Sequence, residues 1–163
     1  IETVEQVKKL VEYGKYYPTG RRGFANTRCG GYGFAEHASG NIDEYFSLAN
    51  NETLIIPQCE TKGCLDNIEE IVSIEGVDGI FVGPYDLSIA LGMPAQFGDP
   101  KFLAAVDRIL KACKDAGKFS LIFGGSIEIS KKYIKDGFNG VAYTMDTDIL
   151  VNAYRDRVKQ IKG

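Results

Sequence analysis

The chain has 163 residues, of which 44% are hydrophobic and 25% are charged, and its formal net charge is -3. Those proportions are ordinary for a globular protein that can bury a core of its own. The slight negative balance argues against nucleic acid and acidic membrane surfaces as main partners, and no apolar run reaches the roughly 20 residues that a membrane-spanning helix needs.

The chain opens with a predicted helix that ends at Gly14. Thr3 and Gln6 have the spacing of a capping box, and apolar residues follow them at helical spacing. A second helix is predicted from Asn41, with Glu44 completing the same kind of reciprocal cap.

Between these two helices lies a long stretch without a regular period. Its first part, residues 16–23, is rich in turn residues and holds the adjacent cations Arg21 and Arg22. Because neighbouring glycines allow close backbone approach, one of these cations is as well suited to hold an anion or a loop as to serve as surface charge. Residues 24–40 are typical of an active-site lid or an oligomer contact. They include the single histidine, His37, which we interpret as a solvated loop residue rather than a general base.

From residue 54 onward, short apolar runs alternate with helical patterns. The runs are too short for helices and rich in β-branched or aromatic residues, which is typical of buried strands. The expected strands are 54–56, 79–82, 119–123 and 140–143, and the expected helices are 65–73, 87–91, 100–116, 127–136 and 147–161. Repeated strand–helix units predict an α/β fold with a parallel sheet. Four units without a capping edge suit half of a (β/α)8 TIM barrel better than a complete doubly wound domain, and a half-barrel leaves its two strand edges unpaired. We therefore expect one domain over 1–163 that continues at its start or pairs with a second copy.

An acidic residue stands just past each of the first two predicted strands: Glu60 and Asp86. One helical segment joins these strands, so we expect parallel neighbours whose carboxyl ends meet where such sheets and barrels bind ligands. Two carboxylates with room for water and substrate suit a hard divalent cation. Taken alone, each acid is equally well explained as a carboxylate that favours a helix N-terminus.

The four cysteines are Cys29, Cys59, Cys64 and Cys113. Cys59 and Cys64 fall at a predicted strand end and an early helical turn, and no pair has the spacing of a metal finger. Reduced thiols in a cytoplasmic enzyme are therefore favoured over a disulfide or zinc site.

Three motifs carry a resemblance to a known family. Gln58-Cys59-Glu60-Thr61 follows an apolar strand, and the next strand leads into Gly83-Pro84-Tyr85-Asp86-Leu87-Ser88. With the upstream turn Tyr17-Pro18-Thr19-Gly20-Arg21-Arg22-Gly23, they make the chain similar to the HpcH/HpaI family of metal-dependent (class II) pyruvate aldolases. The resemblance covers almost the whole chain and implies the C-terminal half of a TIM barrel. Its most specific element is Gly-Pro-Tyr-Asp-Leu-Ser, whereas Gln-X-Glu alone is weak.

The resemblance implies a site at the strand ends. Glu60 and Asp86 would bind Mg²⁺, Mn²⁺ or Co²⁺, and the turn Gly83-Pro84-Tyr85-Asp86 would hold the pyruvate carboxylate, with Gln58 close by. Arg22 matches the family's Gly-X-Arg-Gly turn and is the predicted catalytic cation. The implied reaction is reversible aldol cleavage of a 2-keto-4-hydroxy acid into pyruvate and an aldehyde, in which a dication stabilises the enolate. Sugar-acid derivatives or dicarboxylic hydroxy-keto acids are the implied substrates, and the implied assembly is a homo-oligomer.

The match to the family is incomplete. The family's Asp-X-Glu-His element has no counterpart here, and His37 does not match it, so we expect the chain to carry the metal half of the site without the proton-transfer half. A citryl- or malyl-thioester lyase of the same superfamily and a truncated assembly subunit remain as alternatives. A phosphate-binding barrel isomerase, suggested by Gly124-Gly125-Ser126 after a strand, is a further one.

Overall fold

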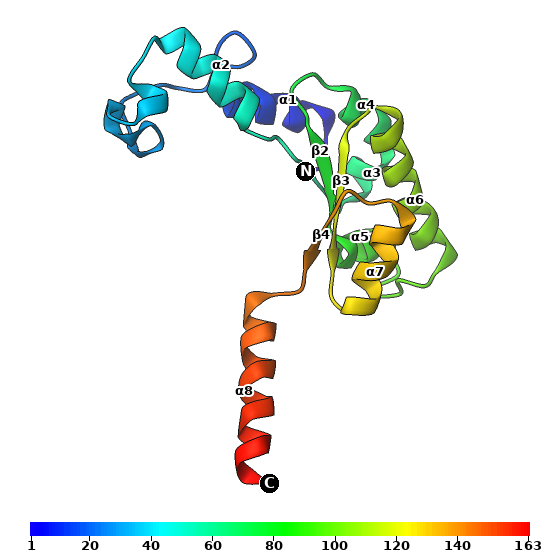
Figure 1. Ribbon diagram of the computed structural model, residues 1–163. Helices are drawn as coiled ribbons and strands as arrows, with labels where there is room; N and C mark the ends of the chain where they lie inside the picture. The colour runs from blue at the N-terminus through cyan, green and yellow to red at the C-terminus, as the bar shows by residue number, and fades with distance from the viewer.

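The computed structural model describes the backbone of residues 1–163 and every side chain except that of Cys29. Its centre is a four-stranded parallel sheet with the order β1-β2-β3-β4 (Figure 1). The strands are β1 (Gln58–Cys59), β2 (Gly79–Val82), β3 (Phe119–Gly124) and β4 (Gly140–Tyr143). The helices are α1 (Val4–Gly14), α2 (Ile42–Glu52), α3 (Lys62–Asp66), α4 (Ile68–Ser73), α5 (Pro84–Ala90), α6 (Pro100–Asp115), α7 (Ile127–Asp136) and α8 (Asp146–Lys162), with short 3-10 turns η1 (Arg28–Gly33) and η2 (Glu36–Ala38). The predicted parallel α/β fold is confirmed.

Helices cover one face of the sheet. Along β3, Ser120 and Ile122 are buried beneath α6 and α7, while Leu121 and Phe123 point the other way and are only half-buried. Chain-sequential strands with helices on one side are the arrangement of successive barrel strands, whose other face lines the barrel interior. The sheet therefore has a packed outer face and an open inner face.

The first strand is shorter and later than predicted. Only Gln58 and Cys59 form the parallel ladder with β2, whereas the predicted strand 54–56 lies outside it. Ile55 is nonetheless buried. Pro57 has no N–H to donate, so regular pairing cannot extend back through it.

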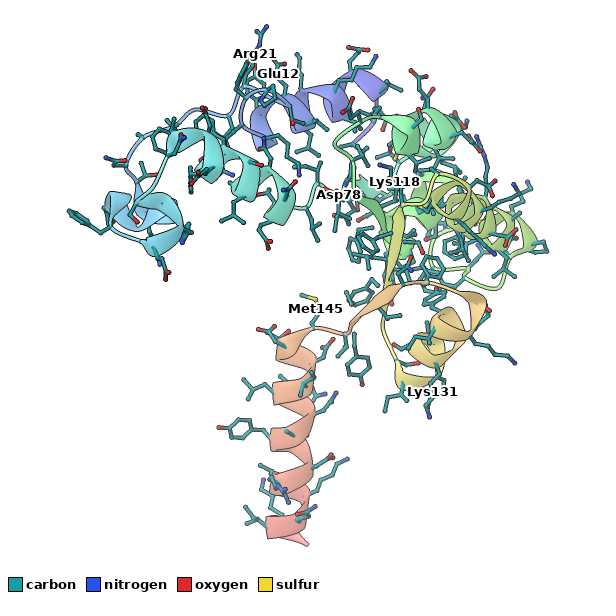
Figure 2. All side chains as sticks on the ribbon, turned by 45° about the horizontal axis from the view of Figure 1, so that its top comes forward. Glu12, Arg21, Asp78, Lys118, Lys131 and Met145 are labelled. Atoms are coloured by element: carbon teal, nitrogen blue, oxygen red, sulfur yellow. The ribbon has the colours of Figure 1, made fainter. Side chains whose placement is uncertain are left out.

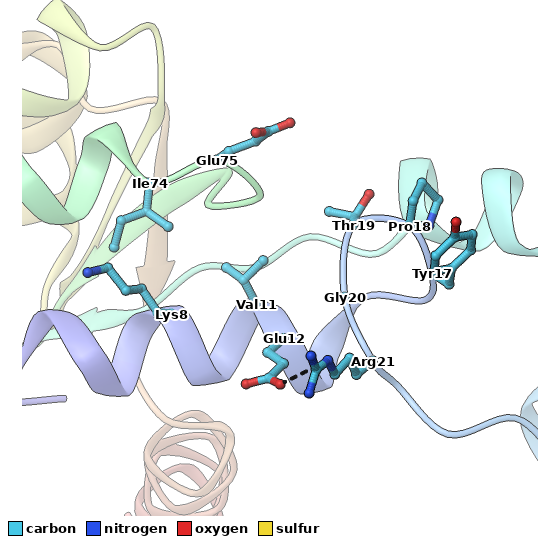
Figure 3. A pocket seen from close by; sticks show the side chains of 10 residues that line it. All are labelled: Lys8, Val11, Glu12, Tyr17, Pro18, Thr19, Gly20, Arg21, Ile74 and Glu75. Atoms are coloured by element: carbon cyan, nitrogen blue, oxygen red, sulfur yellow. Dashed lines mark ion pairs between the residues drawn. The ribbon is translucent and has the colours of Figure 1, made fainter.

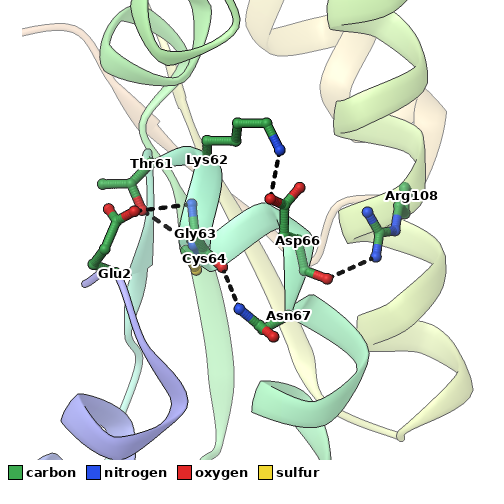
Figure 4. Close-up of polar contacts among 8 residues, drawn as sticks. All are labelled: Glu2, Thr61, Lys62, Gly63, Cys64, Asp66, Asn67 and Arg108. Carbon is green, nitrogen blue, oxygen red and sulfur yellow. Dashed lines mark hydrogen bonds and ion pairs between the residues drawn. The ribbon is translucent and has the colours of Figure 1, made fainter.

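The single helix predicted after β1 is in fact two helices, α3 and α4. They are separated at Asn67, which has φ -108 and ψ 18. Arg108 of α6 bridges the break, because its guanidinium donates to the Asp66 carbonyl at 3.3 Å (Figure 4) and to Glu69 Oε2 at 2.6 Å. The contact anchors the longest helix of the covered face to the segment that follows β1.

Helix α1 links the two ends of β1. At its start, the Gly63 N–H donates to Glu2 Oε1 at 3.1 Å (Figure 4), and Thr61 Oγ1 donates to the Ile1 carbonyl at 2.7 Å. Its predicted capping box is present. Its far end reaches the opposite edge of the sheet, where a Cβ on Gly14 would come within 2.5 Å of Ile55 Cδ1. The segment after α1 thus begins at the side of the sheet where the amino ends of the strands lie, called the amino edge below.

Residues 16–53, called the arm below, extend away from the sheet (Figure 1) and pack around their own aromatic cluster. Tyr16 is buried and stacks on Phe46 with ring centroids 4.4 Å apart, and Phe24 and Tyr45 surround the pair. The predicted reciprocal cap of α2 is replaced by a simpler one, in which Asn41 Oδ1 accepts the Asp43 N–H at 2.9 Å.

A buried lysine joins the arm to the sheet. Lys15 Nζ donates to the Asn50 carbonyl at 2.6 Å and to the Thr53 carbonyl, both at the end of α2. It also lies 3.7 Å from Asp78 Oδ2, just before β2. Because burial of an ammonium is tolerated only when the charge is paired and hydrogen-bonded, these three oxygens fix the arm at the amino edge.

Helix α8 leaves the sheet after Met145, and none of its residues is buried (Figure 1). Figure 2 shows its side chains spread around the helix on all sides. Its apolar residues therefore stay exposed, among them Ile149, Leu150 and Ile161. Within the described part of the chain, no helix combines the length and apolarity needed to cross a bilayer.

Candidate functional site

The residues that follow β1 and β2 lie side by side. Cys59 pairs with Val82 in the ladder, and the Gly83 N–H donates to the Cys59 carbonyl at 3.1 Å. Glu60, the next residue of the first strand segment, is half-buried, and its Oε2 accepts a hydrogen bond of 2.7 Å from Gln58 Nε2. The amide thus fixes one oxygen of the carboxylate at the carboxyl edge of the sheet.

Gly83 makes room for this pair. A Cβ built on Gly83 would lie 2.8 Å from Glu60 Oε2 and 2.9 Å from Gln58 Nε2. The backbone of Gly83, with φ -94 and ψ 92, is open to any residue. Glycine is therefore required here by the neighbouring carboxylate and amide, and this steric role was not foreseen from the sequence.

The turn after β2 presents free backbone donors and a second acid. Helix α5 begins at Pro84, earlier than the predicted helical turn at 87–91, and its first ladder bond runs from the Leu87 N–H to the Gly83 carbonyl at 3.0 Å. The N–H groups of Tyr85 and Asp86 precede that bond and are free of the helix ladder. Asp86 is exposed in the first turn, where the helix dipole favours a carboxylate.

The donor set fits a hard dication. Among the side chains that the structure describes, no group of three or more His, Cys, Asp and Glu is arranged to hold a metal. Glu60 and Asp86 follow adjacent strands, and the space left by the absent Gly83 side chain adjoins the Glu60 carboxylate. Mg²⁺ and Mn²⁺ are commonly held by one or two carboxylates while water and substrate oxygens complete the shell.

Arg22 is not brought to this edge. The guanidinium carbon of Arg22 lies 4.8 Å from the Tyr16 ring centroid, and the backbone N–H of Arg22 donates to the Lys15 carbonyl at 2.8 Å. Both contacts belong to the amino edge of the sheet, opposite Glu60. The catalytic role predicted for Arg22 stays a prediction that no contact within one chain supports.

The other polar loop residues are also remote from the strand ends. His37 stacks near Tyr45 in the arm, with ring centroids 6.1 Å apart. Arg21 pairs with Glu12 at 3.5 Å on the rim of a cavity of about 470 Å³ at the base of the arm (Figure 3). This cavity is also lined by Glu12, Glu75 and Lys8. Because Arg21 is paired with Glu12, it is better described as a paired surface cation than as an anion site.

Three thiols are buried behind the site. Cys59, Cys64 and Cys113 are free and fully buried, as the reduced-thiol interpretation predicts, whereas Cys29 lies outside the described side chains. A hydrogen bond between Cys59 and Cys64 raises the pKa of the Cys59 thiol, and burial adds to the shift. Burial likewise raises the pKa of Cys113 to about 11. The hydrogen bond with Cys59 lowers the pKa of Cys64, and all three thiols pack as core residues.

Comparison with known proteins shows which proteins this chain is similar to. The family model described as HpcH/HpaI aldolase/citrate lyase matches residues 1–153. The chain is 31% identical over 164 residues to the 2-keto-3-deoxy-L-rhamnonate aldolase of Escherichia coli. It is 34% identical over 168 residues to the enzyme of that name from Salmonella schwarzengrund. In both cases the match covers 100% of this chain and 59% of the relative.

Solved structures agree with the sequence relatives. An HpcH/HpaI aldolase/citrate lyase family protein from Burkholderia cenocepacia superposes with a TM-score of 0.87 at 28% identity, covering 100% of this chain and 63% of that one. An HpcH/HpaI aldolase from Desulfitobacterium hafniense has the same TM-score at 24% identity, covering 99% and 61%. The predicted TIM-barrel class is confirmed, and the chain spans about 60% of the length of these proteins.

Proposed function

Because the chain belongs to the HpcH/HpaI aldolase/citrate lyase family, we propose that it carries the cation- and keto-acid-binding part of a class II pyruvate aldolase. The proposed reaction is reversible cleavage of a 2-keto-4-hydroxy acid into pyruvate and an aldehyde. Two relatives named as 2-keto-3-deoxy-L-rhamnonate aldolases, at 31% and 34% identity, support a sugar-derived keto acid as substrate.

One observation carries the proposal. Glycine at position 83 leaves space for the Gln58 amide and the Glu60 carboxylate, and the same residue leads into the turn that bears Asp86. A sheet built only for packing has no need to reserve that volume for two polar groups. Glu60 and Asp86 are the proposed ligands of Mg²⁺ or Mn²⁺, and Gln58 orients Glu60.

In this proposal each residue has a defined task. The free N–H groups of Tyr85 and Asp86 receive the carboxylate of the keto acid, which places its carbonyl beside the carboxylate pair. In the cleavage direction, the bond between the third and fourth carbons breaks, its electron pair passes into the enolate of pyruvate, and the hydroxyl on the fourth carbon loses its proton. A divalent cation supplies the positive charge that stabilises the enolate. The proton acceptor is not among the residues assigned here.

The assembly and location belong to the same proposal. The exposed apolar residues of α8 and the open inner face of the sheet support a homo-oligomer. The free buried thiols support a cytoplasmic location.

The test combines metal binding with enolate formation. Mn²⁺ binding is measured by electron paramagnetic resonance, and exchange of the pyruvate methyl protons in deuterated water is followed by proton NMR. We expect each chain to bind one Mn²⁺, and we expect the affinity to fall at least tenfold in Glu60→Gln and in Asp86→Asn. Exchange of the pyruvate methyl protons should be lost in either variant.

Two outcomes would contradict this proposal. Unchanged Mn²⁺ affinity in both variants would exclude the carboxylate pair as the cation site. Mn²⁺ binding without any exchange, even after the first half of a family barrel is added in trans, would favour the non-catalytic assembly subunit.

A further inference from the structure

The one Asn-Gly pair of the sequence, Asn139-Gly140, lies where the chain enters β4. An asparagine followed by glycine is open to internal attack, because glycine has no Cβ to keep its amide nitrogen away from the asparagine side chain. Asn139 is exposed and lies on the wall of a cavity of about 610 Å³ at the amino edge, between the last turns of α6 and α7. Water therefore has access to this pair.

The side chain of Asn139 is bonded to β3. Its Oδ1 accepts the Ser120 N–H at 2.9 Å and the Ser120 hydroxyl at 3.0 Å. Because a backbone N–H can only donate, the amide of Asn139 must point its oxygen, and not its nitrogen, toward Ser120. Ser120 is 2% exposed. The buried strand thus holds both donors in place.

The Gly140 nitrogen has no such bond to β3. The Asn139 N–H donates to the Ser120 carbonyl at 2.9 Å, so the next N–H along the chain, that of Gly140, points to the opposite side of β4. There β4 is the outer strand of the described sheet, and outer strands carry unpaired N–H groups. In this pair the attacking nitrogen is free and the attacked amide is held.

We propose that Asn139 is a deamidation site and that Ser120 sets the rate of its reaction. The Gly140 nitrogen attacks Cγ of Asn139, the bond from Cγ to Nδ2 breaks, and ammonia leaves with the proton of the Gly140 amide. Water then opens the cyclic imide at either carbonyl and leaves aspartate or isoaspartate at position 139. Water is the only other reactant. The ring closes only when Cγ turns toward the Gly140 nitrogen, so the side-chain bonds to Ser120 must break first.

The two products affect β4 differently. Aspartate keeps the backbone length, and its carboxylate can accept the same two hydrogen bonds from Ser120. Isoaspartate adds a methylene to the backbone between the Asn139 N–H, which bonds β3, and Gly140, which pairs with Leu121. It therefore shifts the register of the strand that leads into α8.

The test compares two variants that each lose a serine hydroxyl. Folded chains are kept in mildly alkaline buffer, conversion at Asn139 is followed by mass spectrometry, and isoaspartate is measured by methyltransferase labelling. We expect Ser120→Ala to deamidate about fivefold faster than the original chain, because the amide loses one of its two hydrogen bonds. Ser130→Ala is the matched control, since the Ser130 hydroxyl donates to the Ser126 carbonyl at 2.7 Å within α7. It should leave the rate unchanged.

A urea series separates local release of Asn139 from a general loss of stability. Deamidation through global unfolding rises with urea in proportion to the unfolded fraction, whereas local release depends little on urea. We expect little dependence below the unfolding transition, with Ser120→Ala faster than the original chain throughout, and equal rates once both chains are unfolded.

Three results would overturn the inference: equal rates of the folded original chain and Ser120→Ala, an equal acceleration by Ser130→Ala, or rates that follow the unfolded fraction. An Asn139 that stays unconverted in both folded chains after the unfolded chain has reacted completely would overturn it as well. None of these measurements involves a metal or a keto acid, so they stand apart from the test of the aldolase function.

Discussion

At the scale of single residues, the proposed site depends on the absence of a Cβ at Gly83. Gly83 adopts a backbone conformation that alanine shares, yet a Cβ there would press on Glu60 Oε2 and Gln58 Nε2. Those atoms are the ends of flexible side chains, so they yield at modest cost to the fold. The main effect of a Cβ at position 83 is instead a changed orientation of the Glu60 carboxylate.

Gly83→Ala should therefore separate binding from stability. We expect Mn²⁺ affinity to fall at least about tenfold, while the free energy of unfolding falls by only about 1 kcal/mol. Gly98→Ala is the matched control, because nothing lies within 4 Å of a Cβ at that position. Equal Mn²⁺ affinities of the two variants by electron paramagnetic resonance would show that the reserved space has no role in metal binding.

The position of Glu60 and Asp86 just past two adjacent strands was predictable from the sequence, because each acid follows an apolar run; their role as ligands stays a prediction. The contact between Gln58 and Glu60 and the steric demand at Gly83 were not predictable, since both depend on which strands are neighbours and in what register. Arg22 illustrates the opposite case. Its motif was visible, but its place over Tyr16 at the amino edge follows from the path of the arm, which has no periodic pattern.

At the scale of elements, the covered face of the sheet depends on a bidentate ion pair. Arg108 of α6 donates to both oxygens of Glu69, at 2.8 and 2.6 Å, next to the break between α3 and α4. Its guanidinium holds the pKa of the Glu69 carboxyl below the ordinary value of 4.5. Because the folded pKa is lowered, the pair stabilises the fold above about pH 4.5, and that stabilisation is lost as the pH falls through the folded pKa.

Glu69→Gln should lower the free energy of unfolding by at most about 1 kcal/mol at pH 7, because the pair is partly exposed and screened by water. The difference from the original chain should be smaller at pH 3 than at pH 7, because the stabilisation is lost as the pH falls through the lowered pKa of Glu69. Urea unfolding at both pH values measures it. Glu70→Gln, on the same helix but not bonded to Arg108, is the control, and a loss at pH 3 as large as at pH 7 would argue against the ion pair.

Element types were largely predictable, whereas element limits were not. The strands 79–82 and 140–143 and a helix over 100–116 were expected from run length and capping residues, and the structure has both strands at those bounds and the helix at Pro100–Asp115. The first strand was placed too early because Leu54–Ile56 is the more apolar segment, while Pro57 decides where pairing starts. The break at Asn67 interrupts a helical pattern that the apolar residues continue on both sides.

At the scale of the whole molecule, the arm is held to the sheet by Lys15. Lys15→Met should remove the donor to the Asn50 and Thr53 carbonyls and leave Asp78 without its cation. We expect the free energy of unfolding to fall by about 2 kcal/mol. Hydrogen exchange should quicken in α2 more than in β2 and β3, because the sheet keeps its own contacts. Lys9→Met, at an exposed position of α1, is the control, and uniform exchange changes throughout the chain would contradict this local role.

The last helix has a different consequence. Since no residue of α8 is buried, its seventeen residues add little to the stability of a single copy, because most helical stability in proteins comes from the packing of an apolar face. Thermal denaturation of a dilute single copy ending at Met145 should give the same midpoint as the intact chain. In an isolated copy, the amino acids from Asp146 onward are therefore open to replacement, labelling or fusion to another protein without cost to the part that carries Glu60 and Asp86.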